Sequence, residues 1–584
     1  MISRSVSDRN WILSKFDENK VKKINQELGI SELLARLLSI RNIQPDECEN
    51  FLNPKIKNSM PNPFSLKGMD LAVEHVIKHV NSKSKICIFG DYDVDGASSS
   101  AILGKFLRYL KCDFFIFIPD RIKDGYGPSP KSFEEIINKG AKLIITVDCG
   151  TTSFEAIEYA NSKKVDVVVI DHHQSTEILP AACAIVNPNR FDEISDLTYL
   201  CAAGVSFLFL SAVINKLRNK DYFKNNNIQE PDLLNYLDLV TLGTVCDVVP
   251  LLGLNRAFVF QGLKVIAKRN NIGIKTLADM ANINAKISTY HIGYILGPKI
   301  NAGGRIGKSE YGTNLLLTED PEKAFSISKE MNILNEKRKS IENIMLEEAI
   351  ILAKQKDNNP VIVLSSNSWH EGVIGIIASR IKDQFNKPAY IINLEGQAGK
   401  GSARSVSGFD IGRAIVRCKQ LNIISKGGGH KMAAGFSIDR NKIDEFELLM
   451  IELFNKSGCE SAKEQDLYID TVLAASAVNE DFFNEINKLA PFGSANREPR
   501  FIIENVSIIK SLILKDIHIK AICKTSSNTN INVICFNSVN TPLGSYLINS
   551  KNKKYDIAGR LSLNEWNGRR EVQFLLDDLA ISQN

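Results

Sequence analysis

The stretch KICIFGDYDVDGASSSAILGKFLRYL, residues 85–110, sets the fold class of this 584-residue chain. Its first five residues, Lys85-Ile-Cys-Ile-Phe89, are mostly apolar and β-branched, as is typical of a buried strand, and residues 97–110 have the apolar spacing of a helix. Between the two lies an acidic segment, Asp91-Tyr-Asp-Val-Asp-Gly96. A strand that leads through a short polar loop into a helix predicts an α/β domain with its functional loops at the strand ends.

The same alternation of strand and helix continues along the chain. Buried strands are predicted at residues 114–118, 142–147 and 165–170, with helix-like segments between them. Such an order predicts a parallel sheet that is covered by helices on both faces. Further along, residues 322–355 contain neither Gly nor Pro. From Pro321 onward this segment predicts a helical rod on the order of 50 Å, long enough to connect two lobes.

The C-terminal part of the chain is rich in short strands. Strands are predicted at residues 501–509, 518–523, 531–536 and 556–563. Asn567-Gly568 is a strong signal for a hairpin turn. Consecutive short strands of this kind favour a small barrel, which we expect to be OB-like.

A chain of this length must be divided into several domains. We expect five regions: an N-terminal helical cap (1–60), a catalytic α/β domain (61–318), a connecting helix (319–358), a second α/β domain (359–456) and an OB-like nucleic-acid-binding domain (457–584).

Composition excludes several classes of protein. With 44% hydrophobic and 24% charged residues, the chain is neither disordered nor collagen-like. The net charge of +5 permits a polyanionic partner but does not require one. The nearly apolar run from Leu200 to Ile214 is too short to cross a bilayer and predicts a buried helix. We expect no secretory signal and no membrane association, and eleven cysteines without a Cys-x-x-Cys pair argue against a zinc ribbon and favour the cytoplasm.

Acidic and histidine side chains follow three of the predicted strands. Asp91–Gly96 follows the first strand, Asp148-Cys-Gly150 the third, and Asp171-His-His173 the fourth. Asp247 stands at the end of a predicted helix. Because the carboxyl ends of parallel strands meet at one edge of the sheet, we expect these clusters to converge on one crevice.

A cluster of carboxylates of this kind requires positive counter-charge. Five carboxylates gathered without a counter-charge would cost several kcal/mol or become protonated. Carboxylate oxygens with one or two imidazoles suit Mn²⁺ or Mg²⁺. Two such ions about 3.5–4 Å apart can activate water and hold a phosphoryl oxygen, which are the tasks of phosphoester hydrolysis.

Each cluster alone has an ordinary structural explanation. An Asp at a strand end often caps the following helix, and a His pair is more often on the surface or in a satisfied core. Asp91–Gly96 also resembles the start of an EF-hand loop, but Ile102 stands where the twelfth-position Glu is required. Four clusters in one α/β domain favour a metal site over these separate explanations.

Two glycine-rich basic segments lie in the second α/β region, GKGSARS at 399–405 and GGGHKMAAG at 427–435. Glycine lets backbone N–H groups approach a phosphate, and Arg404 and His430 can supply positive charge. Alone, each segment is equally well explained as a tight turn.

A third segment, GGRIGKS at 303–309, ends like an ATP-binding P-loop. Ala302 stands where the first required Gly would be, and no strand precedes the segment, so an ATPase is not indicated. Arg305 remains a candidate to clamp a phosphate.

Together, Asp91–Gly96, Asp148–Gly150, Asp171–His173 and Gly427-Gly-Gly-His430 resemble the signature of the DHH phosphoesterase superfamily. Other segments resemble the bacterial single-strand-specific 5′→3′ DNA exonucleases of that superfamily, across nearly the whole chain: PDRIKDGYG at 119–127, GPKINAGGRI at 297–306, LNEKR at 334–338, WHEGVIG at 369–375 and PFGSAN at 491–496.

The resemblance implies two α/β lobes, a parallel-sheet DHH domain and a DHH-associated domain, joined by the long helix and followed by the OB-like barrel. It implies metal ligands, with Asp148 bridging two ions: Asp91, Asp93, Asp95, Asp148, His172 and Asp247. It implies that catalysis depends on Asp93, Asp148, His172 and His173, although the motif leaves open whether Asp95 and His173 bind metal directly. It implies contacts to DNA phosphates from Arg305, Arg380, Ser402, Arg404, Gly428 and His430. Phe89 stands where some members have a metal-binding His, which leaves Asp91 as the substitute.

The implied activity is hydrolysis of single-stranded DNA from the 5′ end to mononucleotides, with two Mn²⁺ or Mg²⁺ ions, in recombination and repair. A single-strand-binding protein and a helicase are the expected partners, and we expect a monomer. One alternative is a small-substrate DHH phosphodiesterase or oligoribonuclease, which would not need the barrel or the cap. Another is an inactive nucleic-acid-binding relative, which would have lost metal ligands.

Overall fold

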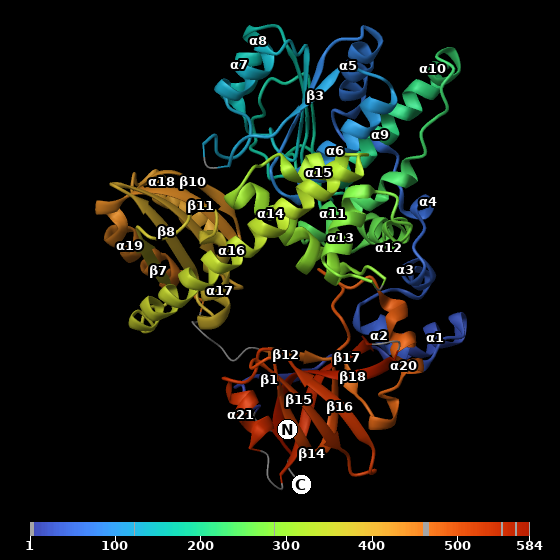
Figure 1. Ribbon diagram of the computed structural model, residues 1–584, viewed down its shortest axis with the longest axis vertical. Coiled ribbons are helices and arrows are strands. Elements are labelled where there is room, and N and C mark those ends of the chain that lie inside the picture. The colour runs from blue at the N-terminus through green and yellow to red at the C-terminus, as the bar shows by residue number, and fades with distance from the viewer. Residues whose placement is uncertain are drawn as a thin grey trace. The chain divides into compact units, whose positions relative to one another are not determined.

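The computed structural model describes residues 5–121, 123–284, 286–459, 466–549, 553–566 and 569–582. Two compact units make up the chain (Figure 1). Residues 60–459 form one unit, and residues 5–59 form the other together with residues 466–582.

A five-stranded parallel sheet organises the first half of the larger unit. Its strands are β2 (Ile86–Gly90), β3 (Phe114–Phe117), β4 (Leu143–Val147), β5 (Asp166–Ile170) and β6 (Ala184–Val186), in the order β3-β2-β4-β5-β6. Every neighbouring pair is parallel, as predicted. The register aligns Gly90, Val147, Ile170 and Val186, so the residues that follow these strands emerge at one edge of the sheet.

Helices cover both faces of this sheet. The apolar side chains of α7 (Pro130–Asn138) and α8 (Phe154–Ser162) pack on one face. On the other face lie α5 (Met69–Asn81), α6 (Val94–Tyr109) and α9 (Ala202–Asn219). Most of α9 is buried, as its apolar sequence predicted. Among the described residues, no helix combines the length and the apolar character needed to span a bilayer.

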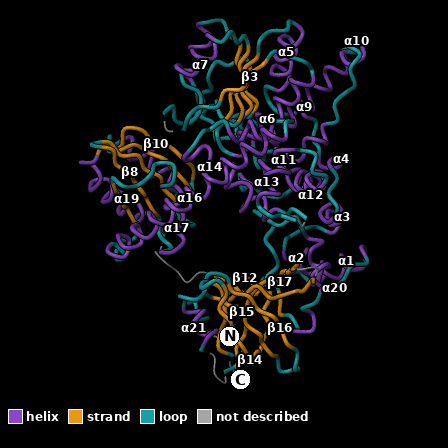
Figure 2. Tube along the Cα trace, viewed as in Figure 1, coloured by secondary structure: helices purple, strands orange, loops and turns teal. Residues whose placement is uncertain are grey.

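A helical region follows the sheet, and Figure 2 shows it as helices joined by loops. Its helices are α10 (Tyr222–Asn225), α11 (Leu237–Cys246), α12 (Gly253–Ala267), α13 (Ile272–Met280), a π-helix (His291–Leu296), α14 (Gly297–Ile306) and α15 (Tyr311–Leu317). The long helix α16 (Pro321–Gln355) then has the bounds that the sequence predicted. Asp320 caps its first turn by accepting hydrogen bonds from the N–H groups of Glu322 and Lys323.

The second α/β lobe of this unit is built on a mixed sheet. Its strands are β7 (Ile362–Ser366), β8 (Ala389–Glu395), β9 (Ala398–Arg404), β10 (Ile424–His430) and β11 (Ala433–Asp439), in the order β10-β11-β9-β8-β7. Only β7 and β8 run parallel. Its helices are α17 (Ile374–Phe385), α18 (Ile411–Gln420) and α19 (Ile443–Lys456).

The smaller unit contains a closed five-stranded barrel, which confirms the expected OB-like fold. The barrel strands are β14 (Phe501–Leu514), β15 (His518–Lys524), β16 (Asn530–Cys535), β17 (Lys554–Trp566) and β18 (Arg569–Ile581). Pairing of β14 with β17 closes the circle. The predicted turn at Asn567-Gly568 lies outside the described residues, between the paired strands β17 and β18. Two helices accompany the barrel, α20 (Glu480–Ile486) and α21 (Pro542–Ile548).

The N-terminal segment shares its core with this barrel. Its helices are α1 (Glu18–Leu28), α2 (Glu32–Ile40), α3 (Cys48–Leu52) and α4 (Ile56–Ser59). Ile24, Leu34 and Leu38 belong to the same buried cluster as Phe501 and Phe574 of the barrel. Strand β1 (Asn10–Leu13) pairs in parallel with β12 (Asp466–Ile469), and β13 (Thr471–Val472) pairs with β14.

Candidate active site

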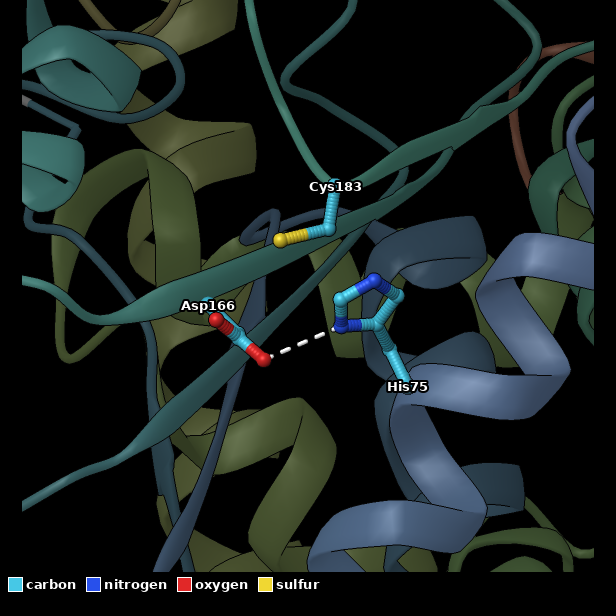
Figure 3. A group of neighbouring side chains, drawn as sticks. All are labelled: His75, Asp166 and Cys183. Carbon is cyan, nitrogen blue, oxygen red and sulfur yellow. Dashed lines mark hydrogen bonds and ion pairs between the residues drawn. The ribbon is translucent and has the colours of Figure 1, made fainter.

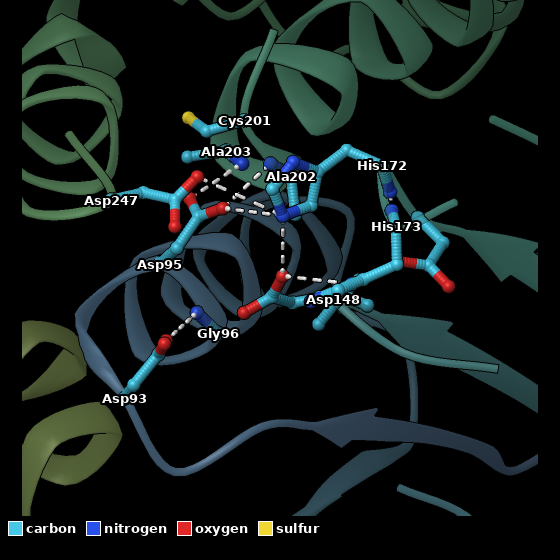
Figure 4. A network of polar contacts seen from close by, with 12 residues as sticks. Asp93, Asp95, Gly96, Asp148, His172, His173, Cys201, Ala202, Ala203 and Asp247 are labelled. Carbon is cyan, nitrogen blue, oxygen red and sulfur yellow. Dashed lines mark hydrogen bonds and ion pairs between the residues drawn. The ribbon is translucent and has the colours of Figure 1, made fainter. Parts of the chain in front are cut away.

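The polar clusters predicted from the sequence meet at the carboxyl edge of the parallel sheet (Figure 4). Asp91 and Asp93 follow β2, and Asp93 caps α6 by accepting a hydrogen bond from Gly96 N at 3.0 Å. Asp148 follows β4 and has a φ of 61°, a left-handed conformation that is uncommon outside glycine. Asp is one of the residues that adopt this conformation most readily, so the turn after β4 accommodates it with little strain.

Seven of these residues form three overlapping groups of potential ligands. In each group the ligand atoms lie within 4.8 Å of one another: Asp91, Asp93 and Asp148; Asp95, His172 and Asp247; and Asp148, His172 and His173. His172 Nε2 lies 3.2 Å from Asp148 Oδ1 and joins the first two groups. Asp148 and His172 therefore link the potential ligands into one continuous cluster.

Asp95 differs from the other carboxylates because both of its oxygens are already engaged. Its carboxylate accepts hydrogen bonds from Ala202 N at 2.6 Å and Ala203 N at 2.9 Å, at the start of α9. A Cβ atom on Gly243 of α11 would lie 2.4 Å from Asp95 Oδ1, so only glycine leaves room for it. Asp95 Oδ2 also lies 3.8 Å from His172 Nε2, at the rim of the second group.

Asp171 orients the two histidines, a role that the sequence motif did not reveal. Its carboxylate accepts hydrogen bonds from His172 N at 2.7 Å, from Thr151 N at 3.0 Å and from His173 Nδ1 at 2.8 Å. Asn187, directly after β6, donates to His173 O at 2.8 Å. These contacts fix the loop that presents both imidazoles.

Two more supporting residues were missed from the sequence. The Tyr126 hydroxyl donates to Asp148 O at 3.0 Å and lies 3.1 Å from His173 Nδ1. Asn189 Nδ2 donates to His172 O at 2.6 Å. Tyr126 lies within segment 119–127, one of the segments on which the family resemblance rests, and this was the only sign in the sequence that it belongs to the site. Asn189 lies in no such segment.

The electrostatics of the cluster show a surplus of negative charge. Burial, and then the charge of Asp93, raise the pKa values of Asp91 and Asp148 well above the ordinary value. Burial, with Asp95 and Asp93, raises the pKa of Asp247 to about 8. Asp91 Oδ1 and Asp148 Oδ1 are buried and accept no hydrogen bond from any described residue. These oxygens fit hard divalent cations, which would favour the ionised form of every carboxyl.

The pKa values of the two histidines are shifted in opposite directions. Burial lowers the pKa of His172, which keeps the ring neutral and available as a ligand. For His173, burial acts in the same direction, but the hydrogen bond to Asp171 outweighs it and raises the pKa to about 9. The hydrogen bond to Asp171 therefore favours the protonated form of the His173 ring.

Positive side chains lie beside the acidic cluster. Arg305, at the end of α14, donates from Nη1 to Gly372 O at 3.1 Å. Burial, and then the nearby cations Arg121, Arg338 and Arg404, lower the pKa of Arg305 to about 10, and Asp93 opposes them. Cations held so close together against their repulsion suit a phosphate group.

The remaining predicted DNA contacts lie on the second lobe. Arg404 Nη1 donates to Ser402 Oγ at 3.3 Å on β9, and His430 ends β10 close enough to Arg404 and His173 for their charges to affect it. Gly428 is exposed on β10, opposite Gly435. Arg380 differs from these residues because its guanidinium pairs with Glu342, with 3.4 Å between Nε and Oε1.

Comparison with known families divides the chain into three matched regions. The DHH family N-terminal domain matches residues 85–244, the DHHA1 domain matches residues 331–456, and the RecJ OB domain matches residues 469–578.

Curated proteins and solved structures resemble the chain over most of its length. The single-stranded-DNA-specific exonuclease RecJ of Escherichia coli is 33% identical over 94% of this chain and 95% of its own. That of Bacillus subtilis is 30% identical over 99% of this chain and 71% of its own. The crystal structure of RecJ from Thermus thermophilus in complex with Mn²⁺ superposes with a TM-score of 0.80 at 26% identity, over 98% of this chain and 80% of that one. A Mg²⁺ complex of the same protein gives a TM-score of 0.75 at 26% identity, over 98% and 79%.

Proposed function

The chain belongs to the RecJ family of single-stranded-DNA-specific exonucleases, and we propose that it degrades single-stranded DNA from the 5′ end to 5′-mononucleotides with Mn²⁺ or Mg²⁺. The observation that carries this proposal is a pair of neighbouring groups of potential metal ligands. They meet where His172 Nε2 lies 3.2 Å from Asp148 Oδ1. Two adjacent cation positions suit in-line hydrolysis of a phosphodiester.

The donor set divides between two ions. Asp91, Asp93 and Asp148 would hold one ion. His172 would hold the other with Asp148 and Asp247, whose carboxylate oxygens lie 3.2 Å and 3.8 Å from its Nε2. Divalent cations in such a site, when bound, polarise the phosphoryl oxygens and make water more acidic. We assign Asp95 to positioning, because its two oxygens already accept the N–H groups of α9.

The protein's own side chains supply positive charge and orientation. Asp171 fixes the ring of His173, and the protonated imidazole can donate a hydrogen bond to the phosphodiester. Arg305 and Arg404 supply further charge for the non-bridging oxygens. Because Tyr126 and Asn187 hold the loops, these groups need little rearrangement when the substrate binds.

We assign the phosphates of single-stranded DNA to Arg305, Ser402, Arg404, Gly428 and His430. Arg380 would join them only after leaving Glu342. The proposal includes a role in recombination and repair, action beside a helicase and a single-strand-binding protein, and a monomeric enzyme in the cytoplasm.

A digest of end-labelled DNA tests the activity and its polarity. With Mn²⁺, 5′-labelled single strands should release labelled mononucleotide at once, whereas 3′-labelled strands should shorten progressively and duplex should resist. EDTA should stop the reaction. Immediate mononucleotide from the 3′ label, or preference for dinucleotides over long strands, would contradict the proposal.

A further inference from the structure

A second group of side chains that could hold a metal ion is shown in Figure 3. It lies where β5 and β6 begin, at the amino edge of the parallel sheet, whereas the candidate active site lies at the carboxyl edge. His75 and His79 lie on α5, Asp166 begins β5, and Cys183 directly precedes β6. None of these residues takes part in the proposed reaction.

The side chains of His75, His79 and Cys183 surround the carboxylate of Asp166. His75 Nδ1 and His79 Nε2 each lie 3.0 Å from Asp166 Oδ2. Ligand atoms of His75, Asp166 and Cys183 lie within 4.8 Å of one another, and Figure 3 shows these three side chains directed toward a common point. The two histidines occupy positions i and i+4, which places both rings on the same face of α5.

Two imidazoles, a thiol and a carboxylate make up a donor set that tetrahedral zinc accepts. Metal–ligand bonds of about 2.0–2.3 Å put neighbouring donor atoms about 3.3–3.8 Å apart. The donor atoms of His75, Asp166 and Cys183 already lie within 4.8 Å of one another, and His79 Nε2 lies 3.0 Å from Asp166 Oδ2, so His79 would join these three ligands as the ion draws the side chains together. The thiolate selects against Mg²⁺ and Ca²⁺, whereas the carboxylate-rich cluster at the other edge favours hard ions. We propose that His75, His79, Asp166 and Cys183 bind a structural zinc ion that ties α5 to β5 and β6.

An ion-pair network is the alternative explanation for this cluster, because Lys78 Nζ also lies 2.9 Å from Asp166 Oδ2. The Lys78 side chain is 63% exposed and can turn into solvent, while the His79 side chain is only 8% exposed and cannot. His79 Nδ1 is buried and has no hydrogen-bond partner among the described residues. An ion pair between Lys78 and Asp166 does not explain why two histidines and a cysteine also lie beside this carboxylate, whereas a metal site does.

Cobalt substitution tests the proposal, because a thiolate ligand gives a charge-transfer band that the carboxylate-rich site cannot give. The full-length protein is stripped with EDTA, supplied with excess Mn²⁺ to fill the catalytic cluster, and titrated with one equivalent of Co²⁺. The wild type should show the thiolate band and tetrahedral visible bands. Cys183→Ser should lose the thiolate band, and His75→Asn should bind cobalt at least about tenfold more weakly.

Cys112→Ser is the matched control, because Cys112 is also half-buried in the same lobe. The cobalt-substituted Cys112→Ser variant should keep the thiolate band. In elemental analysis it should also retain one equivalent of zinc, which Cys183→Ser should have lost. Exonuclease activity should be unchanged in Cys183→Ser, which separates this test from that of the catalytic site. A wild type without the thiolate band, or a band that survives in Cys183→Ser, would overturn the proposal. If Cys183→Ser does not fold, the weaker cobalt binding of His75→Asn decides the question, because the His75 side chain is 29% exposed and the substitution removes no part of the apolar core.

Discussion

The two edges of the parallel sheet hold similar residues in opposite electrostatic settings. Asp148, at the carboxyl edge, is surrounded by Asp91, Asp93 and Asp95, and its pKa is raised well above the ordinary value by burial and by these charges. Asp166, at the amino edge, faces two imidazoles and an ammonium. Burial opposes ionisation there too, but the hydrogen bonds from His79, Lys78 and His75 lower the pKa of Asp166 below its usual range.

Because of this difference, the carboxylates at the carboxyl edge serve the proposed function, whereas Asp166 at the amino edge serves the stability of the fold. A carboxylate among carboxylates destabilises the protein until a cation arrives, which is the expected cost of a site preorganised for metal. A carboxylate that accepts hydrogen bonds from two imidazoles and an ammonium stabilises the fold by itself. Substitutions at the two edges should therefore have opposite effects on activity and on stability.

The largest expected effect is that of Asp148→Asn on catalysis. Loss of the shared carboxylate should reduce exonuclease activity by on the order of 10³-fold, measured with Mn²⁺ on single-stranded DNA. Because its folded-state pKa is raised, ionisation of Asp148 is a penalty that applies at neutral pH and vanishes below about pH 4. In EDTA, Asn should therefore raise the Tm at pH 8 and leave it unchanged at acid pH.

Asp113→Asn is the control for this substitution, because Asp113 is exposed at the opposite edge of the same sheet. It should leave both activity and Tm unchanged. Full activity in Asp148→Asn would refute the assignment of the shared ligand.

Asp171→Asn should have the next largest effect. Removal of a residue that only orients His172 and His173 should reduce activity about 10–100-fold. Without the Asp171 carboxylate, the pKa of His173 should fall from about 9, so the alkaline limb of the pH–rate profile should move to lower pH. An unshifted profile with reduced activity would indicate a merely structural role.

Asp166→Asn should affect stability and spare catalysis. In EDTA at pH 7 it should lower the free energy of unfolding by about 1.5 kcal/mol, the usual value for hydrogen bonds to charged groups. Because the folded-state pKa of Asp166 is lowered, its contribution is complete above the unfolded-state value and is lost as the pH falls through the folded-state value. The difference in Tm between wild type and variant should therefore shrink as the pH falls below about 4, the ordinary pKa of an Asp; a constant difference would contradict this account.

Lys78→Gln should have the smallest effect. The exposed ammonium contributes at most about 0.5 kcal/mol to stability, because solvent screens its interaction with Asp166. Thermal unfolding in low and in high salt measures this contribution. A loss as large as that of Asp166→Asn would show that the lysine, and not the histidine pair, holds the carboxylate.

The sequence predicted the framework of the site because the framework depends on short-range patterns. Short runs rich in apolar and β-branched residues at 85–89, 142–147 and 165–170 correspond to β2, β4 and β5 within one residue at either end. The rule that parallel strands end at one edge then brought Asp91, Asp148 and His172 together from sequence alone. Strand β6 was missed because its three residues are too few to give a pattern.

Long-range contacts explain what the sequence did not predict. The hydrogen bonds that Asp171, Tyr126 and Asn187 make depend on loop conformations that residue identity alone does not encode. The pairing of Arg380 with Glu342 depends on how α16 packs against α17. The sequence did not predict the cluster around His75 and His79, because their partners, Asp166 and Cys183, lie about a hundred residues away and form no recognisable spacing motif.

The parallel pairing of β1 with β12 has a consequence during translation. When Asn10–Leu13 leaves the ribosome, its partner strand Asp466–Ile469 has not yet been synthesised. At about 5–20 residues per second, the nascent N-terminal segment waits roughly 20–90 s while the intervening catalytic unit emerges. During that interval the apolar side chains of Ile24, Leu34 and Leu38 lack their native cover, because Phe501 and Phe574 of the same buried cluster follow them by more than 460 residues.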